Sequence, residues 1–274
     1  MFCPQQMKHF ILTPFYTRRA FRGKNDDSLP PPEWLDHRLR LFEEYCLPSV
    51  ANQSSQNFEW FIYFDETTPA HYLERMRSLT ARYPNVSLKL CAFWESPTII
   101  KHVVAALDQG TKWIITSRLD NDDALHRDFV SMLHSAVEER REFLNFPRGI
   151  ILYSGKCYIY EHRSNAFLSF VEPAESPRTA FSLAHEQAME VAPVRQLGRT
   201  PAFLQVIHGK NVSNKPRGTR IPARRALVGF ETIPAVQHLG ADETALGIIV
   251  DNLAAVIVWR LRDLVISLAK AMRR

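Results

Sequence analysis

The sequence predicts an α/β fold with a mainly parallel central sheet and helices on its faces. In the first half of the chain, short apolar runs rich in β-branched and aromatic residues alternate with longer segments of helical periodicity. This alternation is typical of a parallel sheet, because parallel neighbours need a crossover that is usually a helix. The last run ends in three carboxylates, Asp120, Asp122 and Asp123. Ligands gather at the carboxyl ends of strands in such sheets, so we expect the functional site there.

Helices separate the predicted strands of the first half. The strands are expected at residues 9–13, 58–65, 86–90 and 113–115, and the helices at residues 33–46, 70–83 and 97–109. The apolar residues of the first helix recur at spacings of three and four, which places them on one face. They are Leu35, Leu39, Phe42 and Cys46. Pro48 is expected to end or bend this helix.

The second half has less regular patterns. We expect a helix at residues 128–143, a hairpin or paired strands at 149–160, a strand or turn entering a helix at 181–187 and a strand at 203–208. The basic residues 214–226 suit either a flexible loop that could close over phosphates or a solvated linker. An apolar helix with interrupting charges is expected from Thr244 to Arg274, where it could pack on the domain, pair with a partner or lie on a membrane surface. The predicted domain spans residues 1–230, and residues 231–274 form a helical tail.

The composition narrows the range of partners. A net charge of +5 favours an anionic substrate or a membrane surface. Nucleic acid is a poor candidate, because the sequence has no zinc finger and no basic-aromatic RNA motif. The four cysteines are far apart, so we expect a reducing cytosol and no disulfide framework. We expect neither a signal peptide nor a membrane span.

The acidic cluster predicts a metal site. Three carboxylates at the end of a buried strand repel one another and lose water, so a positive charge should stabilise them. Mg²⁺ and Mn²⁺ prefer oxygen ligands and leave positions open for substrate phosphates. Asp120 and Asp122 are therefore expected to hold a metal that binds a diphosphate. The alternative is an acidic turn or helix cap, since Asp and Asn are common at both.

Candidate nucleotide contacts follow the first two strands. Thr13, Phe15 and Arg18 lie at or just after the end of the first strand, where they could meet a nucleotide. A solvated arginine in a surface loop is an equally good interpretation of Arg18. Asp65 ends the second strand and is expected to contact a ribose or base, or to cap the helix that begins near Pro69.

Further candidates are spread over the rest of the chain. Glu186, beside His185, is the best-placed general base, although a carboxylate in a first helical turn is favourable without any catalytic role. His208 ends the last strand, and it either completes a metal shell, for which Mn²⁺ is the better fit, or lies in a plain loop. Lys210 and Arg118 carry charges that would neutralise a leaving diphosphate.

Several segments, taken together in their order along the chain, form a recognisable sequence pattern. They are His9 to Thr13, Trp34 to Ser49, Gln53 to Trp60, Asp65, Ser117 to Asp123 and Val206 to Asn211. Together they resemble the putative rhamnosyltransferase family of bacterial glycosyltransferases, over about residues 8–215. The resemblance implies a GT-A type fold, a single α/β domain that binds a nucleotide-sugar.

The resemblance also implies residue roles. Asp120 and Asp122 match the Asp-x-Asp motif, whose first acid faces the ribose and whose second acid binds the metal. His208 matches a strand-end histidine that completes the metal shell. Thr13 and Asp65 match positions that meet the nucleoside.

The implied activity is metal-dependent transfer of a sugar from a nucleoside-diphosphate sugar to a hydroxyl of a glycan or other acceptor. The sugar is rhamnose according to the family description. Glu186 stands where such enzymes carry the base that takes the acceptor's proton, and direct displacement would invert the anomeric carbon. We expect a role in polysaccharide or glycoconjugate synthesis, in the cytoplasm or at the inner face of the membrane.

Two other functional classes remain open. A nucleotidyltransferase also needs a metal and a diphosphate, but it would carry a glycine-rich basic loop near the first strand, and the sequence has no such loop. A non-catalytic carbohydrate- or membrane-binding module would use the acids for Ca²⁺ or for nothing. Thermal stabilisation by nucleotides, with and without Mn²⁺, distinguishes these classes.

Overall fold

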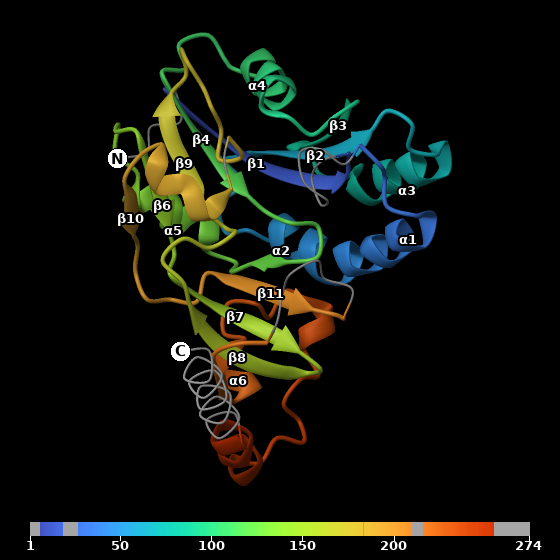
Figure 1. Ribbon diagram of the computed structural model, residues 1–274, viewed down its shortest axis with the longest axis vertical. Coiled ribbons are helices and arrows are strands. Elements are labelled where there is room, and N and C mark those ends of the chain that lie inside the picture. The colour runs from blue at the N-terminus through green and yellow to red at the C-terminus, as the bar shows by residue number, and fades with distance from the viewer. Residues whose placement is uncertain (1–5, 19–26, 183, 210–215, 255–274) are drawn as a thin grey trace, which may run out of the picture.

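The chain forms two mixed β-sheets with helices between and around them (Figure 1). The computed structural model describes residues 6–18, 27–182, 184–209 and 216–254. The predicted α/β class is confirmed, whereas the sequence does not predict the second sheet.

The first sheet has seven strands, and its central strands are parallel as predicted. In order across the sheet they are β10 (Val194–Gln196), β6 (Glu142–Asn145), β9 (Ser169–Pro173), β4 (Trp113–Arg118), β1 (Met7–Tyr16), β2 (Glu59–Asp65) and β3 (Val86–Cys91). Strands β4, β1, β2 and β3 run parallel. The sequence does not predict β9, which lies antiparallel between β4 and β6.

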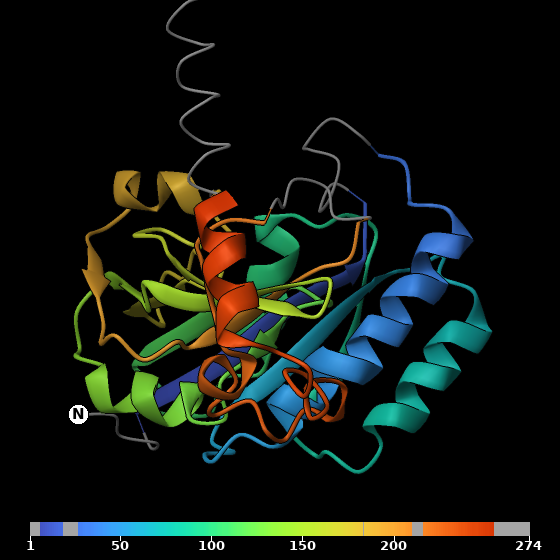
Figure 2. The same cartoon turned by 90° about the horizontal axis from the view of Figure 1, so that it is seen from below.

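Helices cover both faces of the first sheet. The helices before residue 245 are α1 (Pro32–Leu41), the π-helix η1 (Phe42–Cys46), α2 (Leu47–Ala51), α3 (Ala70–Thr80), α4 (Ser96–Ala105), α5 (Phe129–Ala136), the 3-10 helix η2 (His185–Glu190), α6 (Ala223–Ala226) and the 3-10 helix η3 (Pro234–Val236). Of these, α6 and η3 pack on the second sheet. Phe10 and Leu12 of β1 pack with α4, whereas Ile11 packs on the opposite face with α1, α3 and α5, as alternation along a strand requires. Figure 2 shows α1 and α3 side by side on that face.

The segment from α1 to α2 is one continuous helix that Pro48 does not end. The Leu47 N–H bonds to the Phe42 carbonyl, which is the spacing of a π-helix. This wider turn accommodates the proline ring, which would clash with the preceding turn of a regular α-helix. Pro48 therefore changes the helical register locally, and the helix continues to Ala51.

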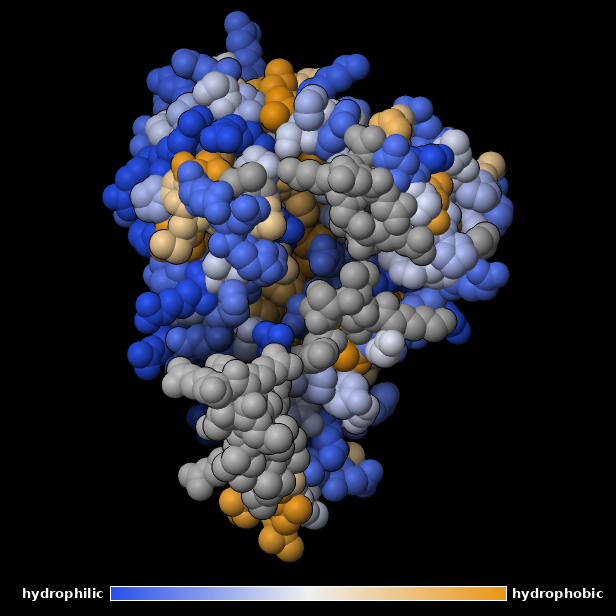
Figure 3. Space-filling model, viewed as in Figure 1, coloured by the Kyte–Doolittle hydropathy of each residue, from blue (hydrophilic) through white to orange (hydrophobic). Residues whose placement is uncertain are grey.

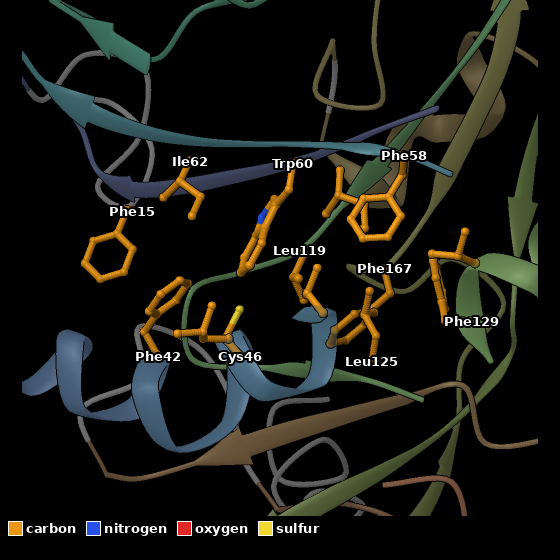
Figure 4. Close-up of a cluster of buried hydrophobic side chains, with 14 of the residues drawn as sticks. Phe15, Phe42, Cys46, Phe58, Trp60, Ile62, Leu119, Leu125, Phe129 and Phe167 are labelled. Atoms are coloured by element: carbon orange, nitrogen blue, oxygen red, sulfur yellow. The ribbon is translucent and has the colours of Figure 1, made fainter. Parts of the chain in front are cut away.

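This helix lies between the two sheets and fills the core there (Figure 4). Phe15 of β1 stacks on Phe64 of β2 with ring centroids 4.8 Å apart, and it meets Phe42 edge to face at 5.2 Å. All three rings are fully buried, and each contributes roughly 1.5–3 kcal/mol of hydrophobic stabilisation. The core thus fixes the helix against the ends of the parallel strands.

The second sheet has five strands and contains the predicted hairpin. In order they are β12 (Thr219–Ile221), β8 (Lys156–Glu161), β7 (Arg148–Tyr153), β11 (Phe203–Ile207) and β5 (Ala124–Leu125). The hairpin of β7 and β8 turns at Ser154 and Gly155, whose φ angles of 47° and 73° suit a type I′ turn. Strand β11 joins β7 in parallel, and this places His208 at the edge of the second sheet.

Two predictions for the second half of the chain are wrong. Helix α5 ends at Ala136, and Phe143 belongs to β6, where its ring stacks on Phe170 of β9 at 4.2 Å. Strand pairing there outweighs the helical spacing of Phe143. The basic segment predicted as a flexible loop contains β12 and α6.

The region after residue 230 packs partly on the second sheet. Ile233 and Val236 are buried in a cluster with residues of β7 and β11. Residues 245–254 are helical, and the remainder of the predicted tail helix lies outside the described residues. Within the part of the chain that the structure describes, no helix is long and apolar enough to cross a bilayer.

Candidate functional site

The acidic cluster lies in a loop where the two sheets meet. Oxygen atoms of Asp120, Asp122 and Asp123 all lie within 4.8 Å of one another. Leu119, directly after β4, is fully buried, and its N–H bonds to the Leu12 carbonyl at 3.2 Å. The first sheet therefore fixes the start of the loop, and β5 of the second sheet follows its end.

Asn121 and Asp123 hold the shape of this loop. The Asn121 side-chain amide donates to the Phe15 carbonyl at 2.8 Å. Asp123 Oδ1 accepts the Val206 N–H of β11 at 2.9 Å. Burial, together with the neighbouring carboxylates, raises the pKa of Asp123 well above its usual value. The bond to Val206 ties the acidic loop to β11 of the second sheet.

Asp122 contacts two basic side chains. Its Oδ2 forms an ion pair with the Arg38 guanidinium and lies 2.9 Å from His208 Nε2. Asp122 and Arg38 are each only 3% exposed. Arg38 also donates to Asn121 Oδ1 at 3.1 Å. The structure thus brings together Asp122 and His208, as the sequence analysis expects, and adds Arg38.

Arg38 and His37 are residues of this site to which the sequence analysis gives no role. Arg38 lies on the apolar face of α1, and an arginine at such a position needs a buried partner. A charged residue at an apolar position of a helix is the sequence pattern that could have identified Arg38 as a site residue. His37 Nε2 lies 2.9 Å from His208 Nδ1, and no feature of the sequence distinguishes His37.

The donor atoms of the cluster fit a divalent metal ion. The carboxylates lie close together with little water, and Arg38 alone would leave the group negatively charged. Burial, and after it the charge of Asp122, raises the pKa of Asp120. A cation compensates such charge, and the His208 imidazole beside Asp122 suits Mn²⁺ better than Mg²⁺. Metal binding by these residues stays a prediction that this arrangement supports.

Arg118 ends β4, two residues before Asp120, and contacts the segment that leads into η2. Its guanidinium lies 4.2 Å from the centre of the Phe181 ring and donates to the Ala180 carbonyl at 3.3 Å. Burial lowers the pKa of Arg118, while the charges of Asp120 and Glu186 act in the opposite direction. One cation therefore interacts with the predicted metal ligands and with the predicted base.

Glu186 is an exposed residue of η2 with an oriented histidine beside it. Its side chain is 64% exposed, and its Oε1 lies 3.1 Å from His185 Nε2. His185 Nδ1 lies 2.7 Å from the Ser164 carbonyl, which can only accept, so Nδ1 carries the proton. Burial lowers the pKa of His185, and the neutral ring then presents Nε2 as an acceptor towards Glu186.

The predicted pair Arg18 and Asp65 meets at the ends of β1 and β2. Arg18 Nε donates to Asp65 Oδ2 at 2.8 Å. Asp65 Oδ1 accepts the Thr67 N–H at 2.9 Å, so this carboxylate also shapes its own turn. Asp65 is buried behind Arg18, whose side chain is 31% exposed.

The other residues predicted to contact the nucleotide do not share the exposure of Arg18. Thr13 is buried, and its hydroxyl accepts the Trp60 indole N–H at 2.9 Å. The Phe15 ring lies in the core, a position that does not favour contact with a nucleotide. Lys210 lies outside the described residues.

Comparisons with known proteins point to one family. The family model described as "Putative rhamnosyl transferase" matches residues 23–220. No curated protein matches the chain.

Several solved structures are similar at low sequence identity. S. aureus TarS 1–349 in complex with UDP-GlcNAc is 12% identical, with 88% of this chain and 69% of that chain covered and a TM-score of 0.46. Another structure of TarS 1–349 is 10% identical, with 73% and 60% covered and a TM-score of 0.44. The T. maritima inositol-1-phosphate CTP transferase is 9% identical, with 85% and 97% covered and a TM-score of 0.39. At these scores the similarity supports no conclusion about activity.

Proposed function

The chain belongs to the putative rhamnosyl transferase family, and from this premise we propose that it is a metal-dependent glycosyltransferase. It transfers a sugar, rhamnose by the family description, from a nucleoside-diphosphate sugar to a hydroxyl of a glycan or other acceptor. The observation that carries the proposal is the buried acidic cluster with His208 beside Asp122. The product would belong to polysaccharide or glycoconjugate synthesis.

The donor diphosphate is assigned to the acidic cluster. Asp120, Asp122 and His208 hold Mn²⁺ or Mg²⁺, and the bound ion supplies positive charge to the leaving diphosphate. Arg38 orients Asp122 from the buried side, which leaves the other carboxylate oxygen for the ion. Arg118, two residues before Asp120 in the chain, adds a second positive charge.

The nucleoside is assigned to the ends of β1 and β2. The exposed part of Arg18 makes the contact, and Asp65 behind it fixes the direction of the guanidinium. Thr13 and Phe15 support this edge from inside, since both side chains are buried. Lys210 is assigned to the diphosphate from its place in the sequence, two residues after His208.

Glu186 is assigned as the base. The acceptor oxygen forms a bond to the anomeric carbon while the bond from that carbon to the diphosphate breaks, and the configuration inverts. The proton of the acceptor hydroxyl moves to Glu186. Protonated Glu186 then donates to His185 Nε2, whose orientation is set by the Ser164 carbonyl.

The protein is assigned to the cytoplasm, with peripheral contact to the membrane. The helix at residues 245–254 exposes four apolar side chains, each more than half accessible: Leu246, Ile249, Val250 and Leu253. Such a stripe, in a tail whose sequence continues with Arg260, Arg262, Lys270, Arg273 and Arg274, suits a surface of anionic lipid. Sedimentation with anionic vesicles should therefore pull down the protein, and a Leu246→Glu/Leu253→Glu variant should stay in solution. Equal sedimentation of both would contradict the contact.

A melting-temperature screen tests the donor half of the proposal. The protein is heated with UDP, GDP, CMP or dTDP, each with Mn²⁺ or EDTA. Wild type is compared with Asp122→Ala and with Asp242→Ala, which removes an exposed acid. We expect a metal-dependent rise with one nucleotide, which Asp122→Ala loses and Asp242→Ala keeps.

The same screen can reject the proposal. No rise with any nucleotide would contradict it and favour a non-catalytic binding module. Metal-dependent release of pyrophosphate from a nucleoside triphosphate would instead favour a nucleotidyltransferase.

A further inference from the structure

A cavity beside Glu186 is not used by the residues assigned to the nucleotide-sugar donor. It has a volume of about 250 Å³ and lies between strands β7, β8 and β11, the loop at residues 162–167 and η2. The face drawn in Figure 3 is hollowed near its middle, and hydrophobic surface is visible inside the hollow. We propose that the cavity binds one sugar ring of the acceptor, with Tyr160 and Gln205 as specificity residues; this inference rests on the proposed transferase function.

The apolar wall of the cavity is built into the fold. Phe203 of β11 stacks on Phe167 with ring centroids 4.1 Å apart. Gly149 permits this stack, because a Cβ atom there would lie 2.1 Å from the Phe203 ring. The Asn165 amide donates to the Phe146 carbonyl at 2.8 Å, and its Oδ1 accepts the Phe167 N–H at 3.0 Å. The wall therefore exists before any ligand binds.

Polar groups reach the cavity from three separate elements. Tyr160 of β8, Gln205 of β11 and Glu186 of η2 all line it. Among the residues that the structure describes, the Tyr160 hydroxyl and the Gln205 amide have no side-chain hydrogen bond. Both groups can donate and accept, so they are suited to a ligand that carries several hydroxyls.

The size and chemistry of the cavity suit a single sugar ring. Pockets for drug-sized ligands span about 300–1,000 Å³. A cavity of about 250 Å³ is smaller than these and suits one ring. A pyranose presents C–H groups on its faces and hydroxyls around its edge. The faces match the partly exposed ring of Tyr160, backed by the buried rings of Phe167 and Phe203, and the edge matches the phenol and the amide.

The position of the cavity indicates the acceptor rather than the donor sugar. Glu186 lines the cavity, and Arg118, two residues before Asp120, contacts Phe181 and the Ala180 carbonyl in the segment that leads into η2. In a direct displacement the attacking oxygen and the leaving diphosphate lie on opposite sides of the anomeric carbon. A hydroxyl held in the cavity would approach from the side of the base, opposite the acidic cluster.

Saturation-transfer NMR tests the cavity without relying on turnover. The probes are the methyl glycosides of glucose, galactose, N-acetylglucosamine and rhamnose. Wild type is compared with Tyr160→Ala, Tyr160→Phe and Gln205→Leu, and with Tyr153→Ala as a control tyrosine of β7 that is exposed outside the cavity.

We expect one glycoside to bind wild type and Tyr153→Ala equally well. Gln205→Leu and Tyr160→Phe should each weaken its binding about tenfold, since each removes hydrogen-bonding groups from a cavity built to use them. Tyr160→Ala should weaken it further, because the ring is lost as well. The acceptor KM should rise in the same order.

The nucleotide-dependent melting shift separates this inference from the proposed function. None of these substitutions removes a residue of the acidic cluster, so all variants should keep the shift with Mn²⁺, which also shows that they fold. If wild type keeps the shift but binds no glycoside, or if binding survives all three substitutions, the cavity is not the acceptor site. If the variants lose glycoside binding while no form binds a nucleotide, the cavity is a saccharide site, and its role as an acceptor site in a transferase is overturned together with the proposed function.

Discussion

The two carboxylates at the centre of the proposed reaction differ in their surroundings. Asp122 is 3% exposed and contacts Arg38 and His208, whereas the Glu186 side chain is 64% exposed and contacts His185. A buried charge must be compensated by fixed groups, while an exposed one is compensated by water. Substitutions around Asp122 should therefore lower the stability of the fold, whereas substitutions of Glu186 should not.

The largest expected effect comes from breaking the buried ion pair. Arg38→Met leaves Asp122 buried without its arginine, and we expect the free energy of unfolding to fall by about 3–5 kcal/mol. Urea unfolding in EDTA measures this loss. Added Mn²⁺ should recover part of it, because the ion replaces the missing positive charge.

Arg75 provides the matched control for this substitution. It forms an ion pair with Glu43 on the surface, where the Arg75 side chain is 49% exposed. Arg75→Met should therefore change stability by at most about 1 kcal/mol. Equal losses for Arg38→Met and Arg75→Met would remove the contrast between buried and exposed charges.

The exposed carboxylate should show the opposite behaviour. Glu186→Gln keeps the shape of the side chain but cannot take a proton. We expect the transfer rate to fall about a hundredfold, equivalent to about 3 kcal/mol of activation free energy, with stability unchanged within about 0.5 kcal/mol. Steady-state kinetics and a melting curve on the same sample measure the two quantities. A full rate in Glu186→Gln would reject Glu186 as the base.

The packing of the cavity wall next to Glu186 can be tested by one substitution. Gly149→Ala forces a methyl group into the Phe203 ring, and we expect a loss of about 1–3 kcal/mol from overpacking. Gly198→Ala is the control, since a Cβ there meets no atom within 4 Å among the described residues. A stable Gly149→Ala with unaltered glycoside binding would show that the wall is not rigid.

Two buried histidines, His9 and His134, also link burial to stability, because both are neutral in the folded protein. His9 Nδ1 lies 3.0 Å from His134 Nε2, and His9 Nε2 lies 2.8 Å from the Ser117 hydroxyl. Burial lowers the pKa of His9 well below its usual value and that of His134 to about 4. An unfolded histidine binds a proton below about pH 6.5, so stability should fall as the pH drops from about 6.5 towards 4.

Urea unfolding at pH 7 and pH 5 measures this smallest effect. Wild type should lose about 1–2 kcal/mol more over this interval than His134→Gln, which keeps a polar partner for His9 but does not titrate. The same loss in both proteins would mean that His134 is not the group responsible.

The sequence predicts the proposed metal site better than the proposed acceptor cavity. Strands β1, β2 and β4 are parallel, so the residues that follow them share one edge of the sheet, as with Arg18 and Asp65. The pairing of Asp122 with His208 follows from the family resemblance, because no periodic pattern links residues so far apart. Arg38 could have been predicted from its charge on an apolar helix face.

The remaining features depend on contacts that no local pattern contains. Strand β9 inserts antiparallel next to β4, and β11 pairs with β7 although about fifty residues separate them. The cavity is formed by three strands, a loop and η2 from different parts of the chain, so neither the aromatic wall nor the pair Tyr160 and Gln205 stands out in the sequence. The family model ends at residue 220 and does not cover the tail.

A ribosome synthesises the two halves of the proposed metal shell at different times. Asp122 precedes His208 by 86 residues, and Asp123 precedes Val206 by 83 residues. The nascent parallel sheet can therefore form while the acidic loop still lacks the strand that anchors it. In the proposed assignment, capture of the ion would belong to a late stage of folding, and a chain released before β11 would lack His208 of the shell.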